Sequence, residues 1–249
     1  MKAGVFDSGV GGLTVVKSLL ENQTFEEILY YGDTARVPYG TKDKNTIIRY
    51  SLEALEYFEN QEIDILIIAC NSASAYALEE LRKIATIPVV GVIDSGILAV
   101  NSKVINKNSN ILVIGTSATI SSNLYELGLK DDGFNNIISK ATPLLVPLVE
   151  EGILNGNIVN STLEHYFSSL ENIDIVILGC THFPLLEAEI SSYLNSATTV
   201  HSGDAIVEFL QKEHKCTKKY ENTKIHFFAS SNPEGLKSVA KKWLGDLIF

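Results

Sequence analysis

Two cysteines follow apolar runs of the same kind. Cys70 comes directly after Ile-Leu-Ile-Ile-Ala, and Cys180 follows Val-Ile-Leu-Gly. Each run predicts a buried strand that delivers a thiol where the next helix begins, and the positive end of a helix dipole favours a thiolate there. Two thiolates able to act as base or nucleophile suggest two-sided chemistry on one small molecule. Cysteine is also often a buried small apolar residue, so a purely structural interpretation of each thiol stays open.

Small polar side chains gather near the other predicted strand ends. With only three arginines in the chain, an anionic ligand would be held by hydroxyls, amides and helix N-termini. Asp7 could take an ammonium group. Together these groups describe a site for a small zwitterion that carries an extra carboxylate. The hydroxyl and amide residues are Ser8, Asn71, Ser72, Thr116, Thr119 and Thr181.

Three further residues are candidates for proton transfer, each with a structural alternative. Asp7 and Glu150 are possible acid/base helpers, although an aspartate at a strand end is more often a helix cap. His182 could stabilise a thiolate or relay a proton beside Cys180, or it could simply cap or pack. Cys216 lies in a polar segment, and we interpret it as incidental.

Nucleotide, metal and redox patterns are incomplete. The glycine-rich stretch at 9–12 lacks the third glycine of a dinucleotide fingerprint, and no Gly-Lys-Ser/Thr follows it. These glycines form either a tight strand-to-helix turn or a direct ligand contact. The chain contains neither Cys-x-x-Cys nor His-Glu-x-x-His, so we expect no metal site and no thioredoxin-like activity.

Strands and helices are expected to alternate along the chain, which predicts βαβ units and a mostly parallel sheet. Pro143 and Pro147 predict a loop that leads to Glu150. The expected strands are 2–6, 25–31, 65–70, 89–93, 111–115, 176–180, a short one that ends near 201, and 224–229. The expected helices are 13–21, 46–60, 72–84, 97–106, one from about 120, 158–170, one from 184, 205–212 and one from about 233.

A spacing repeats between the two halves. Asp7 and Cys70 are 63 residues apart, and Thr116 and Cys180 are 64 apart. Each pair brackets a polar turn, helices and a cysteine-bearing strand. The repeat predicts an α/β fold of two similar doubly wound domains, whose mostly parallel sheets face a shared cleft.

Composition places the chain among soluble globular proteins. Its 249 residues are 45% apolar and 20% charged, with a formal net charge of −10. That charge argues against a nucleic-acid partner, and no apolar run approaches the roughly 20 residues of a membrane span. A strand that starts at Ala3 leaves no room for a signal peptide, and three cysteines make no disulfide framework. We therefore expect a cytoplasmic protein.

Four segments together resemble the cofactor-independent aspartate/glutamate racemase family. They are residues 5–13, 31–40, 69–74 and 179–186, and the likeness spans nearly the whole chain. Ser72 stands where the family usually has threonine, and Phe183 replaces the usual tyrosine. Cys-Thr-His at 180–182 is similar to the glutamate enzymes, whereas aspartate racemases tend to carry Glu after Cys-Thr.

The resemblance implies interconversion of L- and D-glutamate by two cysteines, without a cofactor and without a pyridoxal lysine. Cys70 would deprotonate the D-isomer and Cys180 the L-isomer, with Asp7, His182 and Glu150 assisting. It also implies a homodimer, a role in supplying D-glutamate for peptidoglycan, and domains of 1–94 plus 208–249 and of 95–207. The implied substrate-binding residues are Asp7, Ser8, Pro38, Tyr39, Gly40, Asn71, Ser72, Thr116, Thr119, Thr181 and His182.

Two other functions remain open from the sequence. The substrate could be aspartate rather than glutamate, because the two racemases belong to one family. The same cleft could instead serve a binding module for acidic amino acids that performs no reaction.

Overall fold

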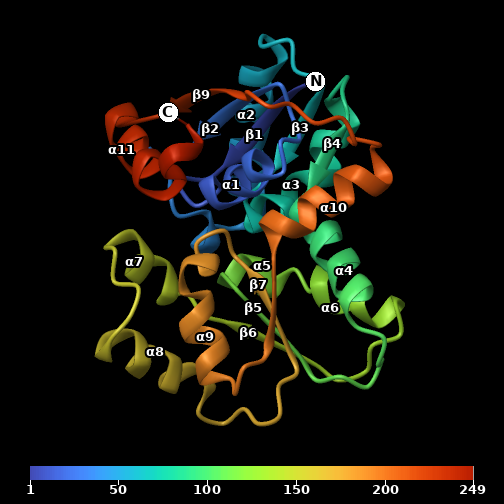
Figure 1. Cartoon of the computed structure of the whole chain (residues 1–249), viewed down its shortest axis with the longest axis vertical. Coiled ribbons are helices and arrows are strands. Elements are labelled where there is room, and N and C mark those ends of the chain that lie inside the picture. The colour runs from blue at the N-terminus through green and yellow to red at the C-terminus, as the bar shows by residue number, and fades with distance from the viewer. Residues whose placement is uncertain (249) are drawn as a thin grey trace.

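Each of two parallel sheets forms the centre of one lobe in the computed structural model of the chain, which describes residues 1–248 (Figure 1). The first sheet has the strand order β4-β3-β1-β2-β9, and the second has the order β6-β5-β7-β8. All pairings within both sheets are parallel. The predicted fold class, two doubly wound α/β units with parallel sheets, is confirmed.

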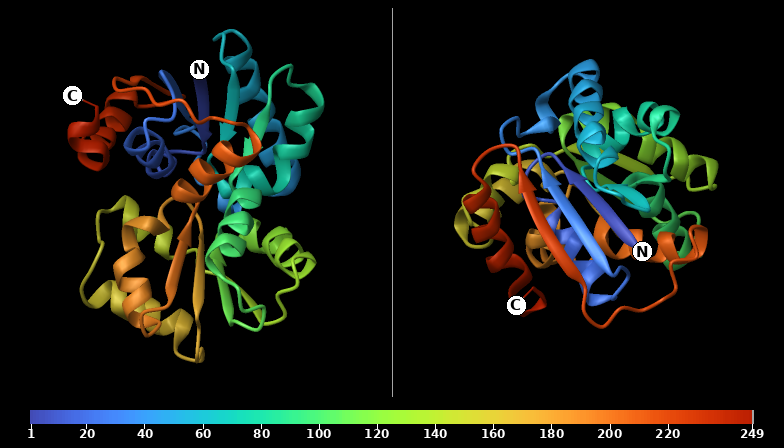
Figure 2. Two further views of the ribbon diagram at one scale, coloured as in Figure 1. Left: turned by 45° about the vertical axis from the view of Figure 1, so that its right-hand side comes forward. Right: turned by 90° about the horizontal axis from the view of Figure 1, so that it is seen from above.

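The central strands are buried on both faces, which explains their uninterrupted apolar sequences. The chain returns to the first sheet at its end, where β9 lies beside β2 (Figure 2). The first sheet consists of β1 (Lys2–Asp7), β2 (Glu27–Gly32), β3 (Ile65–Ile68), β4 (Val89–Gly91) and β9 (Lys224–Ala229). The second consists of β5 (Ile111–Gly115), β6 (Ile137–Ala141), β7 (Ile175–Gly179) and β8 (Thr198–His201).

Helices cover both faces of each sheet and bury an apolar core on every face. On the first sheet, one face packs against α1 (Leu13–Glu21), α10 (Ser202–Glu213) and α11 (Pro233–Leu244). Its other face packs against α2 (Lys44–Glu59) and α3 (Asn71–Ile84). On the second sheet, one face packs against α7 (Leu145–Glu150), α8 (Asn157–Phe167) and α9 (Glu187–Tyr193). Its other face packs against α4 (Val92–Lys103) and α6 (Leu124–Asp131).

Short helical turns complete the secondary structure. They are the five-residue helix α5 (Ser117–Ser121) and the 3-10 turns η1 (Tyr39–Thr41), η2 (Phe183–Leu186) and η3 (Gly245–Leu247). Of these, η1 packs against α5, which brings the two lobes into contact.

The repeated 63- and 64-residue spacing corresponds to the point in each sheet where the strand order reverses. Asp7 and Cys70 lie at the ends of the adjacent strands β1 and β3, and Thr116 and Cys180 follow the adjacent strands β5 and β7. Ligands of open α/β sheets bind at such reversal points, outside the carboxyl ends of the strands. The topology therefore brings both cysteines to equivalent places in the two lobes.

Helix α10 joins the lobes, because it packs against α1 on one side and α4 on the other. The predicted domain limits at 94 and 207 fall inside α4 and α10. The division into 1–94 plus 208–249 and 95–207 stays a prediction.

Three local expectations were wrong. The strand expected over 89–93 ends at Gly91, and helix α4 begins at Val92 rather than at 97. The strand β6 was not predicted, because only two apolar residues open it and it lies at a partly exposed sheet edge. The segment expected to be a loop around Pro143 and Pro147 contains helix α7. Pro147 is its third residue, and the first turn of a helix tolerates proline because its N–H groups have no partner within the helix.

No helix within residues 1–248 is both long enough and apolar enough to cross a membrane.

Candidate active site

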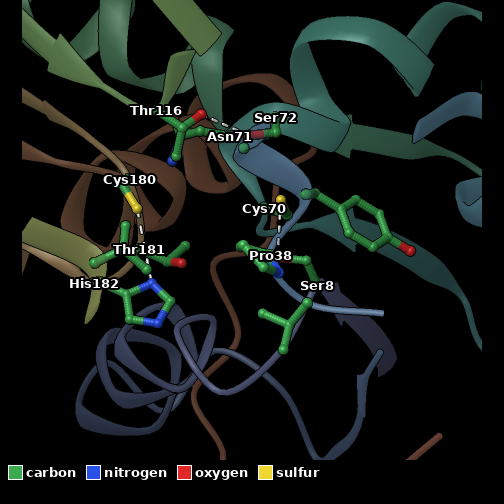
Figure 3. Close-up of a pocket in the computed structure, with 13 residues that line it drawn as sticks. Ser8, Pro38, Cys70, Asn71, Ser72, Thr116, Cys180, Thr181 and His182 are labelled. Atoms are coloured by element: carbon green, nitrogen blue, oxygen red, sulfur yellow. Dashed lines mark hydrogen bonds between the residues drawn. The ribbon is translucent and has the colours of Figure 1, made fainter. Parts of the chain in front are cut away.

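A small cavity lies where the carboxyl ends of the two sheets meet. The two cysteines lie on opposite sides of it in Figure 3. Both are almost completely buried, Cys70 with 5% of its surface exposed and Cys180 with 6%. The lining residues are Ser8, Val37, Pro38, Tyr39, Gly40, Cys70, Asn71, Ser72, Thr116, Val146, Cys180, Thr181 and His182.

Cys70 immediately precedes helix α3, and its Sγ lies 3.5 Å from the hydroxyl oxygen of Ser8. Burial raises the pKa of the Cys70 thiol to about 12, and the nearby carboxyl of Asp7 adds to the rise. The Ser8 hydroxyl and the backbone at Ala73 act in the opposite direction but do not compensate. Burial therefore outweighs the helix terminus at this sulfur, and Cys70 is a protonated thiol near neutral pH.

Cys180 has a different neighbour, because its Sγ lies 3.7 Å from Nδ1 of His182. On the other side of the imidazole, Nε2 of His182 lies 3.3 Å from a carboxylate oxygen of Glu150. The Trp243 ring from α11 packs nearly perpendicular to the His182 imidazole, with ring centroids 6.4 Å apart. The histidine that was expected to cap or to assist thus contacts the sulfur directly.

Charge controls the protonation of His182. Burial lowers its pKa, but the polar contacts with Cys180 and Glu150 and the charges on Cys180 and Asp7 outweigh burial and raise it to about 10. An imidazolium at this position stabilises negative charge on the adjacent sulfur.

Asp7 lies behind the cavity and is fully buried. Its carboxylate accepts a hydrogen bond from the backbone N–H of Gly9 at 2.9 Å and one from the Thr181 hydroxyl at 3.4 Å. Burial raises the pKa of Asp7, and the positive charge of His182 and the hydrogen bonds oppose the rise. Asp7 therefore connects the turn after β1 with the turn that carries Cys180.

Gly11 permits the close approach of the two lobes at this point. A Cβ atom at residue 11 would lie 2.3 Å from the Thr181 hydroxyl oxygen and 2.7 Å from the His182 ring. Thr14, one helical turn further on, donates a hydrogen bond to the backbone carbonyl of Thr181 at 2.8 Å. A side chain at position 11 would overlap the Thr181 and His182 side chains and displace them.

Three hydroxyls form a cluster on another wall. Ser72 and Thr116 lie 2.8 Å apart through their hydroxyl oxygens, and Thr119 lies 3.1 Å from Thr116. Gly40 packs directly on Thr116, since a Cβ there would lie 2.5 Å from the Cβ of Thr116. The cluster joins α3 of the first lobe to α5 of the second and offers donors for a carboxylate.

The loop with Pro38, Tyr39 and Gly40 is held from behind by buried Asp33. Tyr39 donates its hydroxyl proton to Asp33 at 2.5 Å, Arg36 donates at 2.6 Å, and Ser230 donates at 2.7 Å. Ser230 follows β9, so the end of the chain helps to fix a wall of the cavity.

Most of the predicted site residues meet in one place. Thr119, Asp7 and Glu150 do not line the cavity but contact residues that do. The lining residues Val37 and Val146 were not predicted. Both are apolar residues, of a kind that occurs throughout the core, so no sequence signal distinguishes them.

The free energy of unfolding should fall as the pH rises from about 6.5 to about 9. His182 has a pKa of about 10 in the folded protein against an ordinary value of 6.5, so folding retains a proton that the unfolded chain releases in this interval. Stability from this group is fully present below pH 6.5 and is lost as the pH approaches 10. The expected loss by pH 9 is about 1–3 kcal/mol, measured by urea unfolding.

The matched control is His182→Gln, which retains a polar side chain but cannot titrate. Its free energy of unfolding should depend less on pH over the same interval. Parallel curves for the two proteins would contradict the raised pKa of His182.

Comparisons with known proteins agree with this geometry. The sequence pattern of the Asp/Glu/Hydantoin racemase family matches residues 13–210. The chain is 59% identical over 247 residues to the glutamate racemase of a Nitratiruptor species, an alignment that covers 99% of this chain and 97% of the relative.

Two solved structures extend the likeness to three dimensions. The crystal structure of glutamate racemase from Campylobacter jejuni has a TM-score of 0.97 at 55% identity, with all of both chains covered. The glutamate racemase from Francisella tularensis, solved in complex with D-glutamate, has a TM-score of 0.86 at 35% identity, covering 100% of this chain and 95% of the other. The resemblance inferred from the four sequence segments is thus confirmed, and the chain belongs to the Asp/Glu/hydantoin racemase family.

Proposed function

We propose that this chain interconverts L- and D-glutamate by proton transfer at Cα between Cys70 and Cys180. The observation that carries the proposal is the placement of the two thiols. They follow equivalent strands of two similar sheets and lie on opposite sides of one cavity. Inversion of a stereocentre needs one group on each face. The names of relatives at 50–59% identity support glutamate as the substrate.

In the L-to-D direction, the thiolate of Cys180 removes the Cα proton. The C–H bond breaks, an S–H bond forms at Cys180, and the electron pair remains on the substrate as a carbanion conjugated with its carboxylate. The thiol of Cys70 then gives its proton to the opposite face, which forms the new C–H bond and leaves a thiolate. The D-to-L direction runs through the same steps in reverse.

The raised pKa of Cys70 and the imidazolium beside Cys180 suit the L-to-D direction. Cys70, with its raised pKa, holds the proton that is to be donated. Protonated His182 stabilises negative charge on Cys180, 3.7 Å away. After one inversion the two sulfurs have exchanged roles, and we propose that Asp7 and His182 help to return the protons.

Stabilisation of the carbanion is the main energetic requirement, because a Cα proton is a very weak acid. Preorganised donors aimed at developing charge are usually the largest contribution in such reactions. We propose that the hydroxyls of Ser72, Thr116 and Thr181, with Asn71, hold the substrate carboxylates. Ser8 would accept a hydrogen bond from the ammonium group, and the carboxylate of Asp7 behind this wall would favour its positive charge.

The test is incubation of the purified protein with D-glutamate in D2O without added cofactor. We expect the Cα proton signal to disappear from the NMR spectrum while L-glutamate appears by chiral chromatography. Binding measured by calorimetry, with neither exchange nor interconversion, would instead indicate a binding module. A higher kcat/KM for aspartate than for glutamate would assign the alternative substrate.

Two consequences of the family resemblance remain proposals. We propose that the D-glutamate supplies peptidoglycan synthesis, and that the enzyme is a homodimer. Light scattering coupled to size-exclusion chromatography would measure the oligomeric state.

A further inference from the structure

The side chain of Asn71 is engaged at both ends by residues of other elements. Asn71 follows Cys70 directly and lines the cavity with only 2% of its surface exposed. Its Oδ1 accepts a hydrogen bond from the hydroxyl of Tyr125 at 2.8 Å. Its Nδ2 donates to the hydroxyl of Ser202 at 3.2 Å. Tyr125 belongs to α6 and Ser202 begins α10, so neither is near Asn71 in sequence.

Tyr125 and Ser202 together hold the amide group of Asn71 in place. The hydroxyl of Ser202 also hydrogen-bonds to Tyr125, so the three side chains form a closed ring of interactions. The Tyr125 hydroxyl donates to the carbonyl oxygen of the amide, and the amide nitrogen donates to the Ser202 hydroxyl. One N–H of Nδ2 serves Ser202, and the second remains for a ligand.

The Tyr125 ring also contacts the segment that carries the other cysteine. A Cβ at Gly179, the residue before Cys180, would lie 3.3 Å from a ring carbon of Tyr125. A Cβ at Gly96 would lie 3.0 Å from the opposite edge of the ring. The ring is buried to 3% exposure between these two glycines. One side chain thus contacts the residue after the first thiol and the residue before the second.

We propose that Tyr125 is a positioning residue of the racemisation site. Its hydroxyl fixes the orientation of Asn71 beside Cys70, and its ring holds the backbone of Gly179 beside Cys180. It does not line the cavity and transfers no proton. The inference rests on the proposed function in one respect, namely that both cysteines act on one substrate.

Tyr125→Phe tests the hydroxyl while it keeps the ring. We expect kcat/KM for glutamate to fall about 10- to 100-fold, because the amide loses the Tyr125 donor at Oδ1 and the ligand-facing N–H loses its fixed direction. We expect the loss mainly in kcat, measured well below the melting temperature. A purely structural tyrosine would lower the melting temperature and leave kcat per folded enzyme unchanged, which would overturn the proposal.

Tyr193→Phe is the matched control. It removes a phenolic hydroxyl of the same lobe that also donates a hydrogen bond, to Glu164, at the end of α9. Its kcat and KM should equal those of the unaltered protein. An equal loss in both variants would overturn a specific role for Tyr125.

A double-mutant cycle asks whether Tyr125 acts through Asn71. In an Asn71→Ala background, Tyr125→Phe should change kcat/KM by less than about twofold, because the amide it orients is already gone. Independent, multiplicative losses would show that the hydroxyl does not act through Asn71.

A readout without substrate separates this proposal from the proposed function. Iodoacetamide labelling followed by mass spectrometry gives the ratio of alkylation at Cys70 to that at Cys216, which is buried and lies outside the cavity. Tyr125→Phe should change this ratio at least about threefold, and Tyr193→Phe should leave it unchanged. An unaltered ratio in Tyr125→Phe overturns the positioning role even if the protein racemises no glutamate. If the ratio changes but the protein is inactive on glutamate, the positioning role of Tyr125 is supported. Only the proposed glutamate racemisation is then rejected.

Discussion

Cys70→Ala and Cys180→Ala should each lose glutamate racemisation by at least about 10³-fold in kcat. Each variant lacks the proton donor or acceptor on one face of Cα, and a positioned acid or base typically contributes about 10²- to 10⁴-fold. Both sulfurs are buried, so bulk water cannot readily replace either of them. Chiral chromatography of L-glutamate formed from D-glutamate measures the loss. Full racemisation by either variant would contradict the two-thiol mechanism.

Cys216→Ala is the internal control for these substitutions. Cys216 packs against the core between the first sheet and helices α1, α10 and α11 and does not line the cavity. Its removal should leave kcat and KM unchanged. The free energy of unfolding should fall by less than it does when a large core side chain is truncated to alanine. A comparable loss of activity would show that cysteine substitution acts through stability rather than chemistry.

Gly11→Ala should lower kcat/KM about 100-fold or more. The added Cβ would lie far inside contact distance of the Thr181 hydroxyl and the His182 ring. Relief of that overlap requires the Thr181 and His182 side chains to move, which breaks the contact between the His182 ring and the Cys180 sulfur. A displacement of about 1 Å within the site is enough for a loss of this size. We also expect overpacking to cost about 1–3 kcal/mol of stability, measured by urea unfolding.

Gly133→Ala provides the comparison for Gly11→Ala. Gly133 has a φ of +89°, and a Cβ placed on it would have no neighbouring atom within 4 Å, so alanine there strains the backbone without touching the site. The free energy of unfolding of the Gly133→Ala variant should fall by about 1 kcal/mol, while its kcat/KM stays the same. If Gly11→Ala behaved in the same way, the close approach at residue 11 would have no part in positioning His182 beside Cys180.

The central strands could be predicted because they are buried on both faces. Their continuous apolar sequences stop where a polar turn begins, and this change placed Cys70 and Cys180 at the ends of β3 and β7. The edge strand β6 has one exposed apolar residue, Ile138, and no such contrast with its surroundings. Strand prediction therefore failed where the sheet meets solvent.

Interactions across the lobes were beyond sequence reasoning for a different reason. Tyr125 looks like any aromatic residue on the apolar side of a helix, and only the packed lobes bring its hydroxyl to Asn71. The contact of Glu150 with His182 likewise depends on α7 turning back toward the cavity. The residue types at the cavity wall could be predicted, whereas their supporting partners required the tertiary structure.

The unequal neighbours of the two thiols place a thermodynamic constraint on the proposed reaction. Enantiomers have equal free energy in water, so the equilibrium constant of racemisation is one. A hydroxyl beside Cys70 and an imidazolium beside Cys180 can make kcat differ between the two directions. The Haldane relation then requires KM to differ by the same factor. Any substitution near one sulfur must therefore change kcat/KM for both enantiomers equally, however one-sided its contacts are.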